Sequence, residues 1–255
     1  MNEHFSFERL AWLLRADLAN GYRSLLMVSA TLAGIILIAS LTSSEPIDAT
    51  QGYFGTWYGG MLYIWGIIAT SRAFTELHDK ARNEAYLLIP ASAFEKTIAR
   101  LLAVTVGLSV YLLVFTTAVS LLVWLVQRLL PGTGFGLFNP LDPRLWPVIT
   151  GYLFLQSFYF LGAAWFARRH LVKTTLVIVL AGIGLGLFTL LTMRVVFAPE
   201  GIGDLGNAVT RAVESFPDLL RLLDGLWTIV VVVLPLACWS IAWLRVRETQ
   251  VSDGV

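Results

Sequence analysis

The side chains with the clearest chemistry are the charged ones in segment 71–100, which lies between two long apolar stretches. The first half of this segment carries apolar residues at helical spacing on one stripe. The charged residues on the opposite side are Arg72, Glu76, Asp79, Lys80 and Arg82. Glu76 and Lys80 are four residues apart, a spacing at which opposite charges stabilise a helix. These charges can form ion pairs with another protein, and the alternative is a charged connector that only links two apolar helices.

The residues that follow predict a break and then a second helix. Pro90 donates no backbone hydrogen bond and disfavours helical geometry in the residue before it, so it ends the first helix. Ser92 and Glu95 have the spacing of a capping box, in which the hydroxyl accepts from the Glu95 N–H and the carboxylate accepts from the Ser92 N–H. A simple connector needs only a few residues, whereas this pattern predicts a stiff helix–break–helix corner.

No other group of residues predicts a catalytic centre, a metal site or a cofactor site in this chain. The three histidines are far apart in the sequence, and the single cysteine, Cys238, lies inside an apolar run. The sequence contains no G-x-x-x-x-G-K-[ST] phosphate loop, so a nucleotide would have to be bound in that way by another chain. Gly182 and Gly186 form a G-x-x-x-G pattern within an apolar stretch, which favours close helix packing.

The elements that hold these residues are predicted to be transmembrane helices. Of the 255 residues, 57% are apolar and only 14% are charged, whereas soluble domains carry about a quarter of charged residues. A bilayer core needs roughly 20 apolar residues in a helix. Six stretches meet this requirement: Ser24–Leu41, Phe54–Ser71, Arg100–Val126, Trp146–Phe166, Val172–Met193 and Gly225–Leu244. The fold class predicted for the chain is therefore all-α, as a polytopic membrane protein with a single domain over residues 1–255.

The segments outside the six stretches predict the orientation. Of the 18 Lys and Arg residues, 13 fall on the side that holds both termini, which the positive-inside rule makes cytoplasmic. Residues 1–23 show apolar residues at helical spacing among charges, which predicts a tail with an interfacial helix. Residues 198–224 predict an outer loop with short amphipathic helices. The formal net charge of +1 gives no reason to expect a nucleic-acid partner, whereas membrane lipids surround the chain.

The run F-x-E-L-H-D-K-x-R-x-x-x-Y-L-L-x-P-A-S-x-x-E-K, from Phe74 to Lys96, resembles the cytoplasmic loop of ABC-2 type permeases, the membrane subunits of ATP-binding-cassette transporters. The resemblance implies that residues 72–98 form the coupling loop. Its residues that would meet the ATPase subunit, or hold the corner that passes force to the third helix, are Arg72, Glu76, Asp79, Lys80, Arg82, Pro90, Ser92, Glu95 and Lys96. ATP and Mg²⁺ would be bound by that separate ATPase, in the inner membrane of a bacterium.

The function implied by this resemblance is ATP-driven export through a dimer of permeases, which would be a homodimer or a heterodimer. This chain would then be no enzyme itself. Candidates for the wall of the substrate pathway are aromatic residues of the second and fifth stretches: Tyr58, Tyr63, Trp65 and Phe188. One alternative is an ion-independent channel or facilitator, and another is a membrane anchor for a cytoplasmic protein. The residues leave open whether the cargo is a lipid, peptide, drug, glycan or ion.

Overall fold

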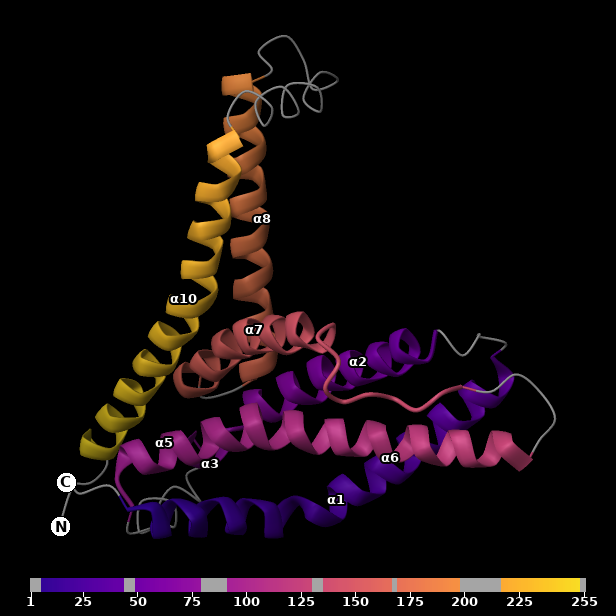
Figure 1. The fold of residues 1–255 in the computed structure, drawn as a ribbon. Coiled ribbons are helices and arrows are strands. Elements are labelled where there is room, and N and C mark those ends of the chain that lie inside the picture. Colours follow the sequence, from indigo (N-terminus) through magenta and orange to yellow (C-terminus); the bar gives the residue numbers. More distant parts are fainter. Residues whose placement is uncertain are drawn as a thin grey trace.

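A computed structural model describes residues 6–43, 49–78, 91–129, 135–166, 169–197 and 217–252. The described residues form helices and contain no strand, so the all-α prediction is confirmed. Figure 1 shows their arrangement. The elements are α1 (Phe7–Thr42), α2 (Thr50–Ser71), α3 (Thr75–His78), α5 (Ala93–Leu102), η2 (Ala103–Gly107), α6 (Leu108–Leu129), α7 (Leu145–Trp165), α8 (His170–Phe197) and α10 (Pro217–Ser252).

Helices α1, α2, α6 and α7 form a bundle with a common apolar core (Figure 1). The helix α2 supplies Phe54, Tyr58 and Leu62, which are fully buried. The turn before α7 covers one end of the core with Phe135 and Phe138, and the Phe135 ring lies 5.7 Å from that of Phe54. The two rings therefore close the end of the bundle at which α7 begins.

One continuous helical run, residues 93–129, replaces the predicted stretch Arg100–Val126. It consists of α5, a π-helical turn η2 and α6. The run begins directly after Ser92, where the capping box was predicted, and its 37 residues exceed the length needed to cross a bilayer. Thus α5 carries the start of this helix beyond the predicted span, toward the side of α3.

The interfacial helix predicted in residues 1–23 is not a separate element. Helix α1 runs without interruption from Phe7 to Thr42, and Gly21 lies inside it. A glycine costs a helix about 1 kcal/mol relative to alanine, which a long helix tolerates. Figure 1 shows α1 changing direction between a first part that lies beside α5 and a second part that enters the bundle.

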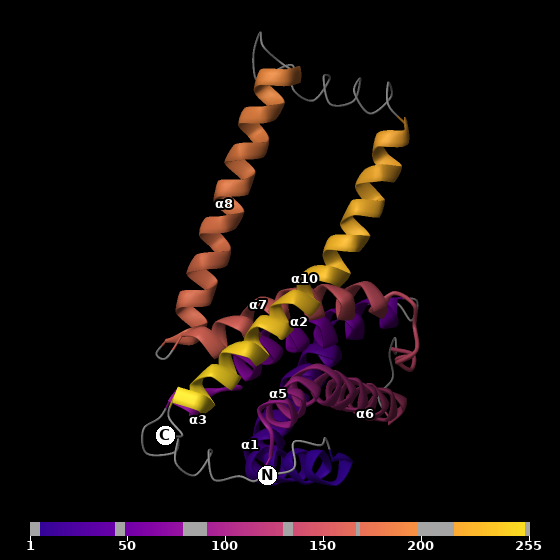
Figure 2. The ribbon, with the colours of Figure 1, turned by 90° about the vertical axis from the view of Figure 1, so that its left-hand side faces the viewer.

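Helix α8 and the first half of α10 project away from the bundle (Figures 1 and 2). The start of α8 packs on the end of α7, where Arg169 has a left-handed φ of 54° that makes the connecting turn sharp. Beyond this contact the apolar side chains of α8 are exposed, as are most of those of α10 between Leu226 and Leu234. The short helices predicted in the outer loop lie mostly in residues 198–216, outside the described residues, whereas α10 already begins at Pro217.

Among the described residues, five helical runs are long and apolar enough to cross a membrane, which indicates a membrane protein. They contain the segments Leu25–Thr42, Ala93–Leu129, Leu145–Trp165, His170–Thr192 and Gly225–Thr249. Helix α2 corresponds to the second predicted span, Phe54–Ser71, and is not among these five. It has 22 residues and no charged one, but its glycines, threonines and tyrosines lower its mean hydropathy. The count of six spans therefore remains a prediction.

Candidate functional site

The corner segment, residues 72–96, packs against the ends of two other helices. In α3 and the turn before it, Ala73, Phe74 and Leu77 are buried among apolar residues of α7 and α10. The Phe74 ring lies 5.0 Å from the Phe160 ring of α7 in an edge-on contact. Arg72 is exposed. The apolar stripe predicted for the beginning of this segment is therefore on the buried side, and Arg72 points away from it.

We call the five charged residues predicted on the exposed side of this segment, Arg72, Glu76, Asp79, Lys80 and Arg82, the charged row. Three of them are not among the described residues. Asp79, Lys80, Arg82 and Pro90 lie outside the described residues, so their predicted contacts with an ATPase stay predictions. Glu76 belongs to α3, but its side chain is not among those described.

The capping box predicted at the start of the second helix is present. The Ser92 hydroxyl accepts a hydrogen bond from the Glu95 backbone N–H at 3.2 Å, and the Glu95 carboxylate accepts one from the Ser92 N–H at 2.9 Å. Both donors belong to a helix start, where backbone N–H groups have no partner within the helix. The start of α5 is therefore fixed by its own side chains.

Glu95 also binds the start of α1, a contact that the sequence pattern did not predict. Its Oε1 accepts from the Ser6 backbone N–H at 2.8 Å and from the Arg9 guanidinium at 2.9 Å. The Glu95 side chain is 0% exposed and that of Arg9 is 38% exposed. Four N–H donors and one opposite charge compensate for the burial of this carboxylate. We call this cluster of Ser6, Arg9, Ser92 and Glu95 the latch.

The helix α10 closes the other side of α5. The ring of Phe94 makes an edge-on contact with Trp243, with ring centres 5.8 Å apart. Lys96, which the resemblance assigned to the coupling residues, is only 3% exposed. Its side chain therefore lies inside the corner, where it can hold the packing but presents no surface to a partner. Helix α5 is held between α1 and α10.

The four residues predicted to line a pathway do not form one wall. Tyr58 is buried in the bundle core, and Tyr63 lines a groove between α2 and α7. Trp65 lines a separate, smaller cavity between α1, α2 and α6, with a volume of about 80 Å³. Phe188 is 67% exposed on the projecting part of α8. Of these two spaces, the one that Tyr63 borders is the larger.

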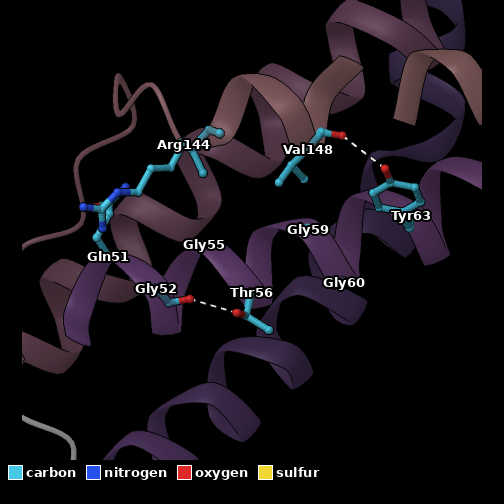
Figure 3. A pocket seen from close by; sticks show the side chains of 10 residues that line it. Gln51, Gly52, Gly55, Thr56, Gly59, Gly60, Tyr63, Arg144 and Val148 are labelled. Atoms are coloured by element: carbon cyan, nitrogen blue, oxygen red, sulfur yellow. Dashed lines mark hydrogen bonds between the residues drawn. The ribbon is translucent and has the colours of Figure 1, made fainter. Parts of the chain in front are cut away.

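That groove, which we call the α2–α7 groove, has a volume of about 520 Å³. Figure 3 shows its floor on α2 and its opposite wall on α7, with Arg144 and Gln51 at one end and Tyr63 at the other. Its lining is Gln51, Gly52, Gly55, Thr56, Gly59, Gly60, Tyr63, Arg144, Leu145 and Val148. The four glycines leave the backbone of α2 without side chains along the groove.

Below the groove, two tyrosines pack into glycines of the facing helix. A side chain at Gly66 of α2 would collide with the Tyr152 ring, and one at Gly151 of α7 would collide with the Tyr63 hydroxyl. The two rings are 6.2 Å apart and nearly perpendicular. The Tyr152 hydroxyl donates a 2.6 Å hydrogen bond to the carbonyl of Val104 in the π-helical turn. Helix α7 thus contacts the long helix where its geometry changes.

The described residues contain no group of three or more His, Cys, Asp or Glu side chains that could hold a metal ion. Cys238 is a free, buried thiol. Comparisons with known protein families, with curated proteins and with solved structures find no match for this chain. The functional inference therefore depends on the residues and geometry of the chain itself.

Proposed function

We propose that the chain is the permease subunit of an ATP-driven exporter and that a separate ATPase subunit binds the corner segment. The observation that carries the proposal is the latch. It joins the starts of α1 and α5 through one buried carboxylate, directly after the segment that bears the charged row. In this proposal, a force applied to residues 72–91 is transmitted through the latch to the helical run 93–129.

The packing of α3 supports the same proposal. Phe74 and Leu77 attach the buried side to α7 and α10, which leaves Arg72 exposed at the beginning of the charged row. A helix that is fixed on one side and charged on the other can transmit movement of a bound protein to several spans. In this proposal the chain crosses the membrane six times, with both termini in the cytoplasm.

The substrate pathway is proposed to lie between two copies of the permease. The apolar side chains along the projecting part of α8 are exposed in the part of the chain that the structure describes, as Phe188 illustrates. A side chain added at Gly182 or Gly186 would meet nothing within 4 Å, so this surface is open to lipid or to a second chain. A second copy would bring its own aromatic residues opposite Phe188.

The decisive experiment starts from a tagged full-length chain purified from its own membranes in mild detergent. An ATPase subunit with a phosphate loop should co-purify and be identified by mass spectrometry. Exchanging the charges of Glu76 and Lys80 together (Glu76→Lys with Lys80→Glu) should then abolish the ATP hydrolysis stimulated by the permease, because the ion pairs with the partner would become repulsive. The amount of chain inserted in the membrane should stay the same.

The matched control exchanges Arg247 and Glu248 (Arg247→Glu with Glu248→Arg). Both residues are exposed near the end of α10, outside the corner segment, and the exchange also keeps the net charge. This control should leave ATP hydrolysis unchanged. An unaltered rate of hydrolysis in the Glu76 and Lys80 variant would exclude the charged row as the ATPase contact. If no ATPase co-purifies, a channel or a membrane anchor replaces the exporter.

A further inference from the structure

The α2–α7 groove contains more glycine than the packing of the two helices requires. At Gly59 an added Cβ would lie 3.2 Å from Val148, and at Gly55 it would lie 3.7 Å from Leu145. At Gly52 and Gly60, in contrast, an added Cβ would meet nothing within 4 Å. Each of these two glycines costs the helix about 1 kcal/mol relative to alanine without any close neighbour in the chain. Their effect is to keep the groove open.

The positive charge at one end of the groove belongs to Arg144 and has no opposite charge beside it within the described residues. Arg144 is exposed, and its guanidinium forms no hydrogen bond or ion pair there. The nearest acidic group along the chain, Asp142, accepts a 2.8 Å hydrogen bond from the Arg144 backbone N–H rather than from its side chain. Gln51 beside it is held by two hydrogen bonds to the Asn139 backbone. The Arg144 guanidinium therefore lies at one end of the groove, beside a glutamine whose side chain is fixed by hydrogen bonds.

The dimensions and position of the groove match one lipid chain. From Gln51 to Tyr63 the floor extends for about 18 Å along α2, which is close to one leaflet of a hydrocarbon core about 30 Å thick. The exposed Trp146, two residues after Arg144, is of the type that favours the headgroup level. The floor below that level is formed by glycines and bordered by Leu145 and Val148.

We infer that the α2–α7 groove binds an anionic phospholipid of the surrounding leaflet, with the phosphate on Arg144 and one acyl chain lying along Gly52–Gly60. The positive charge at the headgroup level attracts the anionic lipid, and the apolar floor accepts the acyl chain in place of bulk lipid. This inference requires only that the bundle is embedded in a membrane. It stands or falls separately from the proposed ATPase partner.

The test uses the purified full-length chain, incubated with equal amounts of phosphatidylglycerol and phosphatidylcholine that carry the same acyl chains. Native mass spectrometry then measures the lipids retained. One cation at the surface favours an anionic headgroup by about fivefold, so the wild-type chain should retain phosphatidylglycerol over phosphatidylcholine by this factor. Arg144→Gln should lose the preference but still retain either lipid. Gly60→Leu should lose the retained lipid, because its side chain fills the groove.

Two control variants separate the groove from general effects. Arg128→Gln removes another cation, which stacks 4.4 Å over the Trp124 ring at the end of α6, and should keep the lipid preference. Gly34→Leu adds a side chain at a position on α1 that is also open, and should keep the lipid. Circular dichroism and the unfolding midpoint check the fold of each variant. Gly52→Leu is the second groove-filling variant, used if Gly60→Leu does not fold.

Three results would overturn the inference. Equal retention of the two lipids by the wild-type chain would exclude the anionic headgroup. Unchanged retention in both glycine variants would exclude the groove as the binding place. If Gly60→Leu changed the oligomeric state, measured by light scattering, and left the retained lipid unchanged, the groove would instead be a contact between copies of the chain.

Discussion

At the scale of single residues, Glu95 has the largest structural role in the corner. One carboxylate completes the capping box of α5 and accepts hydrogen bonds from the Ser6 N–H and the Arg9 guanidinium of α1. The two helix starts are 86 residues apart in sequence at Arg9 and Glu95. Because backbone N–H groups at helix starts have no partner within their own helix, a single buried acceptor can serve both. Its loss would leave several donors unsatisfied at once.

We therefore expect Glu95→Gln to lower the free energy of unfolding by about 3 kcal/mol, as is typical when one partner of a buried ion pair is removed. Arg9→Ala should cost less, about 1 kcal/mol, because its guanidinium is partly solvated and Glu95 keeps the backbone N–H donors of Ser6 and Ser92. Chemical unfolding of the purified chain in detergent micelles measures both values. A larger effect for Arg9→Ala than for Glu95→Gln would show that the charge, rather than the double capping, holds the latch.

At the scale of elements, the π-helical turn η2 divides the long helix into α5 and α6. Such turns are often found at functional sites. Here the turn lies between the latched start of α5 and the part of α6 that packs in the bundle core. The Tyr152 hydroxyl holds the turn through the Val104 carbonyl. The turn is thus the place where a movement of α5 would be transmitted to α6 or absorbed.

We expect Tyr152→Phe to destabilise the chain by about 1–2 kcal/mol, because the Val104 carbonyl would lose its donor in a buried place. Tyr63→Phe is the matched control on the facing helix. Its hydroxyl is 3.4 Å from the Val148 carbonyl, near the limit of a hydrogen bond, so its loss should cost less than about 0.5 kcal/mol. Unfolding midpoints of the two variants give the comparison. Equal midpoints would mean that the contact with the π-helical turn has no special role in stability.

Local patterns allowed some of these elements to be predicted. Ser92 and Glu95 are three residues apart, so their hydrogen bonds follow from the geometry of one helix start. The contact of Glu95 with Ser6 and Arg9 depends on how α1 packs against α5, and no periodicity encodes it. The continuity of α1 was not predicted, because residues 1–23 and the first apolar stretch differ in charge pattern and were assigned to separate helices, whereas a helix of 36 residues tolerates Gly21. The α2–α7 groove likewise depends on which glycines face α7.

At the scale of the whole molecule, the number of spans determines on which side of the membrane each terminus and each connecting segment lies. The five apolar runs are a firm feature of the chain, but an odd number would place the two termini on opposite sides. Helix α2 has no charged residue, and both α6 and α7 pack on it, so it lies in the centre of the bundle. Its low mean hydropathy comes from residues that face protein rather than lipid, such as Tyr58 and Gly66. We therefore expect α2 to cross the membrane together with its neighbours.

Cysteine labelling in intact cells tests this topology, because the native Cys238 is buried and should not react. With six spans, Leu141→Cys should react with a membrane-impermeant thiol reagent, since Leu141 is 85% exposed in the predicted outer turn. Asn2→Cys and Ser252→Cys should react only after the membrane is permeabilised. If α2 did not cross and the N-terminus stayed inside, every later element would be inverted. Ser252→Cys would then react in intact cells and Leu141→Cys would be protected.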